Sequence, residues 1–184
     1  LNEASLLLKE RGPDDCGVWN DESCALGHRR LSIIDLSNAG HQPMVSSNER
    51  YVCVFNGEIY NYNIIKKKLL AETQNHKFKS NSDTEVLLES WCLWQERLLP
   101  MLDGMFVFAI WDKIEKTLHV ARDRMGEKPL YYHFDGNLFA FASRPSAIFK
   151  LLPGLSKRYS SQGIRYFIES GYVPAPFSIH DKLK

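Results

Sequence analysis

The sequence has almost no excess of charge of either sign. Its 23 lysine and arginine residues oppose 22 aspartate and glutamate residues, so the formal net charge is +1 over 184 residues with histidine neutral. A protein that binds a nucleic-acid backbone or an anionic membrane surface needs a basic excess gathered on one face. The composition therefore argues against nucleic acid and membrane as partners.

Long hydrophobic runs are also missing. The longest uninterrupted run, from Met105 to Trp111, has seven residues, whereas a helix that spans a membrane needs about 20. We expect neither a membrane span nor a signal peptide, and therefore a cytoplasmic protein. With 44% hydrophobic and 24% charged residues, the chain has the composition of an ordinary globular domain with a packed core.

Cysteine is scarce and scattered. The four residues, Cys16, Cys24, Cys53 and Cys92, include no C-x-x-C pair and have no histidines clustered beside them at metal-binding spacing. We therefore expect no structural zinc site. Cys24 and Cys53 fall in apolar stretches that resemble strands, where a free thiol packs as a small hydrophobe, and Cys16 is expected in a loop.

Hydrophobic periodicity predicts an α+β domain of antiparallel sheets covered by helices, because strands outnumber helices and consecutive strands are joined by short turns. A capping-box pattern, with Ser82 as N-cap and Glu85 three residues later, begins the best-defined helix. The expected helices cover residues 3–10, 61–72, 83–98, 145–152 and 161–169. The expected strands cover residues 27–34, 51–55, 105–111, 118–122, 130–134 and 138–142.

Two local patterns carry polar groups suited to a ligand. Arg30 lies on one face of the expected strand 27–34. A buried guanidinium needs a carboxylate partner, although charged strand faces are more often simply solvated. Asn56-Gly57-Glu58 follows the buried strand 51–55, where a side-chain amide beside a backbone N–H can bind an oxyanion. The alternative there is an ordinary Asn-Gly turn.

Asp83 is the third candidate, just inside the N-terminus of the best-defined helix. A carboxylate at this position interacts favourably with the helix dipole by about 0.3 to 1 kcal/mol, which by itself explains the residue without a ligand. Together, however, a cation, an oxyanion-binding pair and two carboxylates match a free amino acid with an amide side chain.

Seven sequence blocks, in this order along nearly the whole chain, resemble the N-terminal glutaminase domain of the asparagine synthetase family, the class II glutamine amidotransferases. This resemblance implies the N-terminal-nucleophile hydrolase fold, an αββα sandwich of two antiparallel sheets between helix layers. The blocks are RGPDD (11–15), HRRLSIIDL (28–36), FNGEIYNY (55–62), SDTEVLLE (82–89), LDGMFVFAIWD (102–112), ARDRMGEKPLYY (121–132) and GYVPAP (171–176).

The resemblance implies how the α-groups of glutamine are bound. Arg30 would bind the α-carboxylate, a task that suits a planar guanidinium better than a lysine. Asp83, helped by Glu58, would hold the α-ammonium group. Backbone groups near Ile33 would close the pocket.

The resemblance also implies an oxyanion hole formed by the Asn56 side-chain amide and the Gly57 N–H. The family's nucleophile is an N-terminal cysteine whose own α-amino group serves as its base. The chain begins at Leu1 instead, and none of its four cysteines stands at a chain terminus. We therefore expect a fragment that is inactive alone.

By the same resemblance, residues 1–170 would form the amidotransferase domain without its N-terminal strand. Residues 171–184 would begin a linker to an ATP-dependent synthetase domain that amidates aspartate with the released ammonia. We expect no cofactor or metal in residues 1–184, ATP and Mg²⁺ only in the synthetase domain, and a full-length protein capable of forming a homodimer. The open alternatives are another acceptor, such as a surface sugar or an antibiotic precursor, and a non-catalytic scaffold or regulatory domain.

Overall fold

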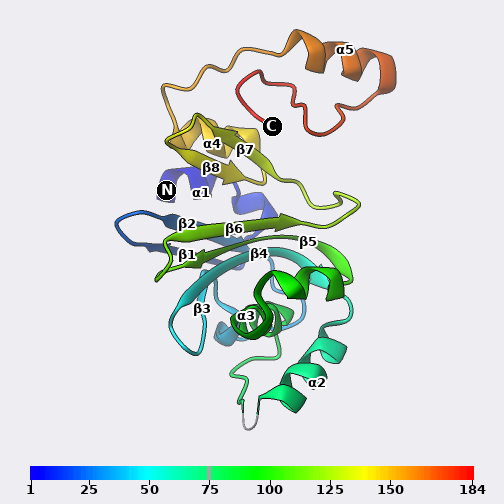
Figure 1. Cartoon of the computed structure of the whole chain (residues 1–184). Helices are drawn as coiled ribbons and strands as arrows, with labels where there is room; N and C mark the ends of the chain where they lie inside the picture. The colour runs from blue at the N-terminus through cyan, green and yellow to red at the C-terminus, as the bar shows by residue number, and fades with distance from the viewer. Residues whose placement is uncertain (74–75) are drawn as a thin grey trace. The chain divides into compact units, whose positions relative to one another are not determined.

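The computed structural model describes residues 1–73 and 76–184 and divides them into two compact units (Figure 1). The first unit comprises Leu1–Asn2 and Lys9–Lys128, and the second comprises Glu3–Leu8 and Pro129–Lys184. Among the described residues, no helix is both long enough and apolar enough to cross a membrane.

The first unit is built on a four-stranded antiparallel sheet in the order β3-β4-β5-β6. The long central pair forms because its residues are apolar almost without interruption, which is typical of strands covered on both faces. Nearly every residue of β5 and the first five residues of β4 are buried. The strands are β3 (Met44–Val45), β4 (Tyr51–Ile59), β5 (Gly104–Asp112) and β6 (Thr117–Arg122).

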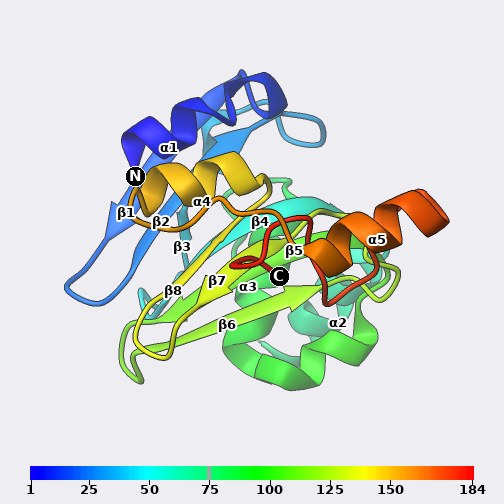
Figure 2. The same ribbon diagram turned by 90° about the horizontal axis from the view of Figure 1, so that it is seen from above.

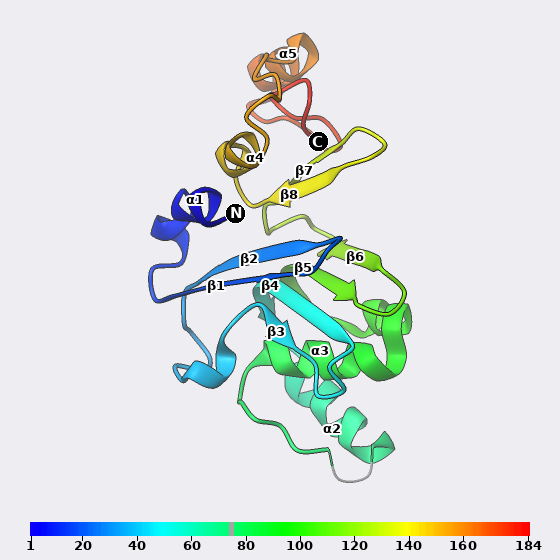
Figure 3. The ribbon, with the colours of Figure 1, turned by 90° about the vertical axis from the view of Figure 1, so that its left-hand side faces the viewer.

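Helices cover one face of this sheet and a β-hairpin covers the other. The helices α2 (Tyr62–Glu72) and α3 (Asp83–Trp94) pack on one side, followed by the 3₁₀ segment η3 (Gln95–Met101). The hairpin of β1 (Asp15–Asn20) and β2 (Ala25–Arg30) lies on the opposite side, as Figure 3 shows. The short 3₁₀ segments η1 (Lys9–Arg11) and η2 (Asn38–Gly40) flank the hairpin in sequence. The main core lies between the sheet and the helices, around Trp91, Phe108 and Leu87.

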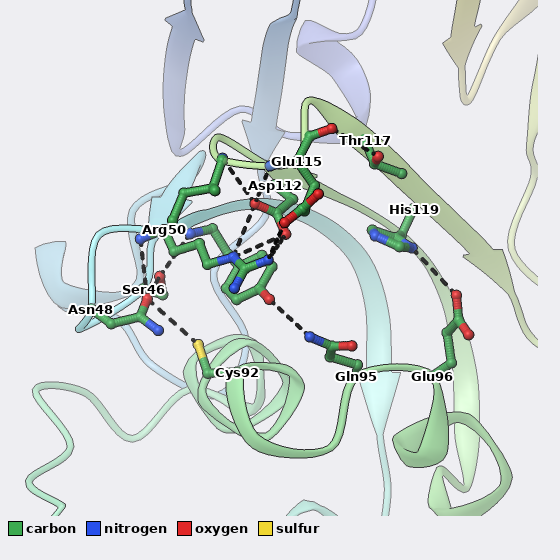
Figure 4. A network of polar contacts seen from close by, with 12 residues as sticks. Ser46, Asn48, Arg50, Cys92, Gln95, Glu96, Asp112, Glu115, Thr117 and His119 are labelled. Atoms are coloured by element: carbon green, nitrogen blue, oxygen red, sulfur yellow. Dashed lines mark hydrogen bonds and ion pairs between the residues drawn. The ribbon is translucent and has the colours of Figure 1, made fainter.

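Polar side chains tie the turns at one end of the sheet together (Figure 4). The Arg50 guanidinium, just before β4, donates from Nε to both Asp112 carboxylate oxygens at 3.0 Å and from Nη2 to Oδ2 at 2.6 Å. Asp112 ends β5 and also accepts the Ile114 N–H at 2.9 Å. This bidentate pair fixes the β5–β6 turn against the start of β4.

The second unit contains a hairpin and two further helices. Strands β7 (Tyr131–Phe134) and β8 (Phe139–Ala142) pair antiparallel, and α4 (Pro145–Leu151) lies along them in Figure 2. The helix α5 (Ser161–Ser170) ends at Gly171, which adopts the left-handed conformation that favours glycine there. Most of α1 (Asn2–Leu6) also belongs to this unit.

Residues 171–184 bond back to the rest of the second unit. The Ser160 N–H donates to the Ile179 carbonyl at 2.9 Å, and Lys184 and Tyr132 exchange backbone hydrogen bonds of 2.8 and 2.9 Å. The proposed role of these residues as the start of a linker stays a prediction.

The expected α+β class with antiparallel sheets is confirmed. The predicted strands 105–111 and 118–122 pair as β5 and β6, and 130–134 and 138–142 pair as β7 and β8. The strands, however, form one four-stranded and two separate two-stranded sheets, where the family resemblance implied two sheets. Strand β2 ends at Arg30, so the prediction that this strand continues to residue 34 is wrong. Strand β1 was not predicted, and Cys16 lies within it and not in a loop. Cys24 precedes β2 and is not part of it.

Two further predictions are corrected by local contacts. Strand β4 does not break at Asn56-Gly57, because β5 pairs with it through Ile59 and Gly104. The capping box forms only in part: Ser82 Oγ accepts the Thr84 N–H at 3.0 Å, but the Glu85 carboxylate bonds to the segment before the helix. The predicted helix 61–72 forms as α2, with Ile65 and Leu69 buried and Ile64 exposed.

Candidate functional site

A cavity of about 370 Å³ opens in the first unit between the end of β2, the outer half of β4 and the N-terminus of α3. Its size is within the usual range for small-molecule sites. The six residues expected from the sequence all line it: Arg30, Ile33, Asn56, Gly57, Glu58 and Asp83. Residues from three separated parts of the chain are thus brought to one place.

Arg30 is the last residue of β2 and is only 9% exposed, so the solvated-face alternative is wrong. Its guanidinium donates from Nη1 to the Ser37 carbonyl at 2.9 Å and from Nη2 to the Asp35 carbonyl. These bonds hold the following loop, in which Ile33 is 71% exposed at the cavity edge. Within residues 1–73 and 76–184, no ion pair joins Arg30 to a carboxylate. The hydrogen bonds of the guanidinium go to neutral carbonyl oxygens, so its positive charge remains able to bind an anion in the cavity.

Asp83 is the first residue of α3 and is 5% exposed. Its Oδ2 accepts the Ile59 N–H at 3.0 Å. Burial raises the pKa of the Asp83 carboxyl, and the nearby Glu58 carboxylate raises it further, against the lowering effect of the Ile59 bond. A bound ammonium group would relieve both the desolvation and the repulsion, so this corner of the cavity is suited to a cation.

The backbone of β4 directs the Gly57 N–H towards the cavity. Along an antiparallel strand, successive N–H groups alternate between its two edges. The N–H groups of Phe55 and Ile59 point away from β5, to Gln42 Oε1 at 2.6 Å and to Asp83. The Gly57 N–H therefore faces the same edge, midway between them.

The side chains of Asn56 and Glu58 lie on the sheet face opposite the main core, because Phe55 packs into that core and strand side chains alternate. This is the face covered by the β1–β2 hairpin, which carries Arg30. The ordinary Asn-Gly turn considered for this tripeptide is wrong, since β4 runs through it. Its continuity instead sets an amide side chain and a backbone N–H next to each other in the cavity wall.

His28 and Gln42 also line the cavity, and the sequence reasoning assigned neither a role. The imidazole Nε2–H of His28 donates to the Phe55 carbonyl at 2.9 Å, while Nδ1 is buried without a partner among the described residues. Burial lowers the pKa of His28 to about 4, so the ring is neutral at pH 7. One signal was present: His28 is two residues before Arg30 and so shares its strand face.

The cysteines are placed unfavourably for nucleophilic attack. Burial raises the pKa of Cys24 to about 11 and that of Cys92 to about 12, and it also raises the pKa of Cys53. In the described part of the chain, no cysteine lines the cavity. No group of three or more histidine, cysteine, aspartate or glutamate side chains is arranged to hold a metal there either.

Similar proteins place this geometry in context. Asparagine synthetase [glutamine-hydrolyzing] 3 of Bacillus subtilis is 43% identical over 143 residues, which cover 77% of this chain and 23% of that protein. Asparagine synthetase [glutamine-hydrolyzing] 1 of the same organism is 35% identical over 184 residues, covering 100% of this chain and 28% of that protein. The chain thus spans about a quarter of the length of these curated relatives.

A solved structure resembles the fold as well. The glutamine phosphoribosylpyrophosphate amidotransferase of B. subtilis, complexed with ADP and GMP, superposes with a TM-score of 0.55 at 26% identity, covering 70% of this chain and 29% of that one. That neighbour is an amidotransferase of the N-terminal-nucleophile hydrolase fold. The family model described as a glutamine amidotransferase domain matches residues 1–184. The family model over the whole chain shows that the chain belongs to the glutamine amidotransferase domain family, and the similar proteins named above are glutamine-hydrolysing asparagine synthetases.

Proposed function

We propose that the cavity binds glutamine and forms the glutaminase site of a glutamine-dependent asparagine synthetase. Arg30 takes the α-carboxylate, Asp83 and Glu58 take the α-ammonium group, and the Asn56 amide with the Gly57 N–H receives the γ-carbonyl oxygen. The observation that carries the proposal is the meeting of a buried guanidinium, hydrogen-bonded to carbonyl oxygens, and two carboxylates in one cavity of about 370 Å³.

The attacking thiolate comes, in this proposal, from a cysteine outside residues 1–184. Thiolate attack on the side-chain amide forms a tetrahedral intermediate, expulsion of ammonia leaves a glutamyl thioester, and water then releases glutamate. The oxyanion hole stabilises the negative charge that develops on the γ-oxygen. Support comes from the raised thiol pKa values of Cys24 and Cys92, which make both poor nucleophiles near pH 7.

The remainder of such a protein would use the ammonia. By analogy with the named relatives, a synthetase domain outside these residues would bind ATP and Mg²⁺ and amidate aspartate, with no cofactor needed in the glutaminase domain itself. Another acceptor is the alternative within the same chemistry. A scaffold without catalysis is the alternative from another class.

Binding of glutamine to the 184-residue chain tests the site directly, since the proposal predicts binding without turnover. Isothermal titration should show that Arg30→Lys, which keeps the charge but loses the planar fork, weakens binding about tenfold or more. The same change at the exposed Arg97 is the matched control and should leave affinity unchanged. Equal affinity for wild type and Arg30→Lys, with both folded, would reject the carboxylate assignment.

Adding a Cys-containing N-terminal segment tests the catalytic half of the proposal. The extended protein should release ammonia from glutamine, and Asn56→Ala should then lower kcat by about 10²- to 10³-fold. Full activity of Asn56→Ala would mean that the oxyanion assignment is wrong. Absence of any hydrolysis by an extended, folded and glutamine-binding protein would favour the scaffold alternative.

A further inference from the structure

Two side chains bond to the backbone of Phe55, the residue immediately before the oxyanion-binding pair. Gln42 Oε1 accepts the Phe55 N–H at 2.6 Å, and His28 Nε2–H donates to the Phe55 carbonyl at 2.9 Å. Strand β3 pairs with β4 only as far as Cys53, so these side chains take the place of a neighbouring strand at Phe55. We call this arrangement of His28, Gln42 and the Phe55 backbone the Phe55 clamp.

The Phe55 clamp connects the separate parts of the cavity. His28 lies on β2, two residues before Arg30. Gln42 Nε2 donates to Thr84 Oγ1 at 3.3 Å, and Thr84 follows Asp83 at the start of α3. One chain of hydrogen bonds therefore runs from the strand that carries the guanidinium, through β4, to the helix that carries the carboxylate.

The bonding partners fix the state of the histidine. A carbonyl oxygen can only accept, so His28 Nε2 carries the proton and the neutral ring has its lone pair on Nδ1. Gln42 is 5% exposed, and both of its amide atoms are used, the oxygen by Phe55 and the nitrogen by Thr84. Breaking either bond to Phe55 would leave a backbone group of that buried residue without its partner, which costs about 1 to 3 kcal/mol.

We propose that His28 and Gln42 are positioning residues that orient the Asn56 amide and the Gly57 N–H towards the side-chain amide of the substrate. The inference rests on the proposed glutamine site and adds to it the two side chains that set the geometry of its oxyanion hole. Donors of an oxyanion hole must lie about 2.7 to 3.1 Å from the oxygen, and small displacements of the groups that hold a substrate are costly. The Phe55 N–H and carbonyl belong to the peptide units on either side of its Cα, so holding both restrains the orientation of the peptide plane that leads into Asn56.

Comparison of two ligands separates positioning from general support of the fold. Glutamine and norvaline share the α-carboxylate, the α-ammonium group and a three-carbon side chain, but norvaline ends in a methyl group where glutamine has its amide. The ratio of the two dissociation constants therefore measures recognition of the amide alone. Titration of the 184-residue chain, followed by NMR, should give a ratio of about ten in favour of glutamine, from two hydrogen bonds of ordinary strength.

His28→Leu, which lacks a donor, should reduce this ratio to near one while the affinity for norvaline changes less than about twofold. His28→Gln, which places an amide N–H near the position of Nε2, should restore most of the ratio. Gln42→Met should also reduce the ratio of the two dissociation constants to near one. It provides a second test if His28→Leu does not fold. Arg30→Lys is the contrasting variant, because it should weaken both ligands equally.

The outcomes are distinguishable. If wild type binds neither ligand, the proposed glutamine site itself fails. If wild type prefers glutamine and folded His28→Leu or Gln42→Met keeps that preference, the Phe55 clamp does not position the oxyanion hole. If either variant weakens the binding of glutamine and of norvaline by the same factor, the replaced residue only supports the fold and the inference is overturned.

Discussion

The buried histidine of the cavity makes the folding of the first unit depend on pH, and replacing it should weaken that dependence. The pKa of His28 is lowered from 6.5 to about 4, chiefly by burial. Between these two values the unfolded chain binds a proton that the folded chain does not. The free energy of unfolding therefore rises with pH across this window: the full stability is present above about pH 6.5 and is lost as pH falls towards 4.

The size of the effect follows from the shift. A difference of about 2.5 pKa units, at about 1.4 kcal/mol per unit, sets an upper limit of about 3 to 4 kcal/mol on the stability lost, most of it between pH 6.5 and 4. The raised pKa of the Asp83 carboxyl works in the opposite direction, because its buried charge destabilises the folded state as pH rises. That contribution is common to wild type and a His28 variant, so the difference between the two isolates the histidine.

Urea unfolding of wild type and His28→Gln at several pH values between 4.5 and 7.5 measures this difference. Tryptophan fluorescence reports on the first unit specifically, because all four tryptophans of the chain, Trp19, Trp91, Trp94 and Trp111, lie in it. His28→Gln should show a clearly shallower fall in stability on acidification. His41→Gln is the control for the loss of a histidine as such, because 49% of the His41 side chain is exposed. Parallel curves for wild type and His28→Gln would refute the reasoning.

Two further changes test contacts that shape the site. Gly57→Ala should lower the melting temperature by roughly 5 to 10 °C, because Gly57 has φ of 150° and a Cβ there would overlap the Met105 carbonyl oxygen. An unchanged melting temperature would contradict this packing. Glu85→Ala should cost about 3 kcal/mol in urea unfolding, since its buried carboxylate accepts the Ser80 N–H at 2.7 Å and the Ser80 hydroxyl at 2.6 Å. Alanine at the exposed Glu96 should cost under about 0.5 kcal/mol, and equal costs at both positions would be inconsistent with the buried network.

Much of the fold was predictable because it depends on local patterns. The apolar run of β5 indicates a strand covered on both faces, and the structure buries it on both. The helix that begins at Asp83 follows from its Ser82 N-cap, and the αL glycine at Gly171 follows from its position after a helical period. Such signals lie within a few residues of one another, so the sequence displays them directly.

Predictions that depended on partners far along the chain were less successful. Asn56-Gly57 suggests a turn by itself, but nine residues of β5 pair with β4 and carry the strand through it. Glu85 completes a capping box in the sequence pattern, yet its carboxylate bonds to Lys79 and Ser80 instead. In each case a tertiary contact outweighed a local preference of about 1 kcal/mol.

The sequence by itself determined the fold class, the family resemblance and six of the residues that line the cavity. Those depend on residue type, order and spacing, which the chain carries whether or not it is folded. Only the tertiary structure decided that Arg30 is buried and bonded to two carbonyl groups, that the Gly57 N–H faces the cavity, and that His28 and Gln42 hold Phe55 between them. Burial and hydrogen bonding depend on which distant segments meet, because desolvation and bond geometry arise only when those segments pack together.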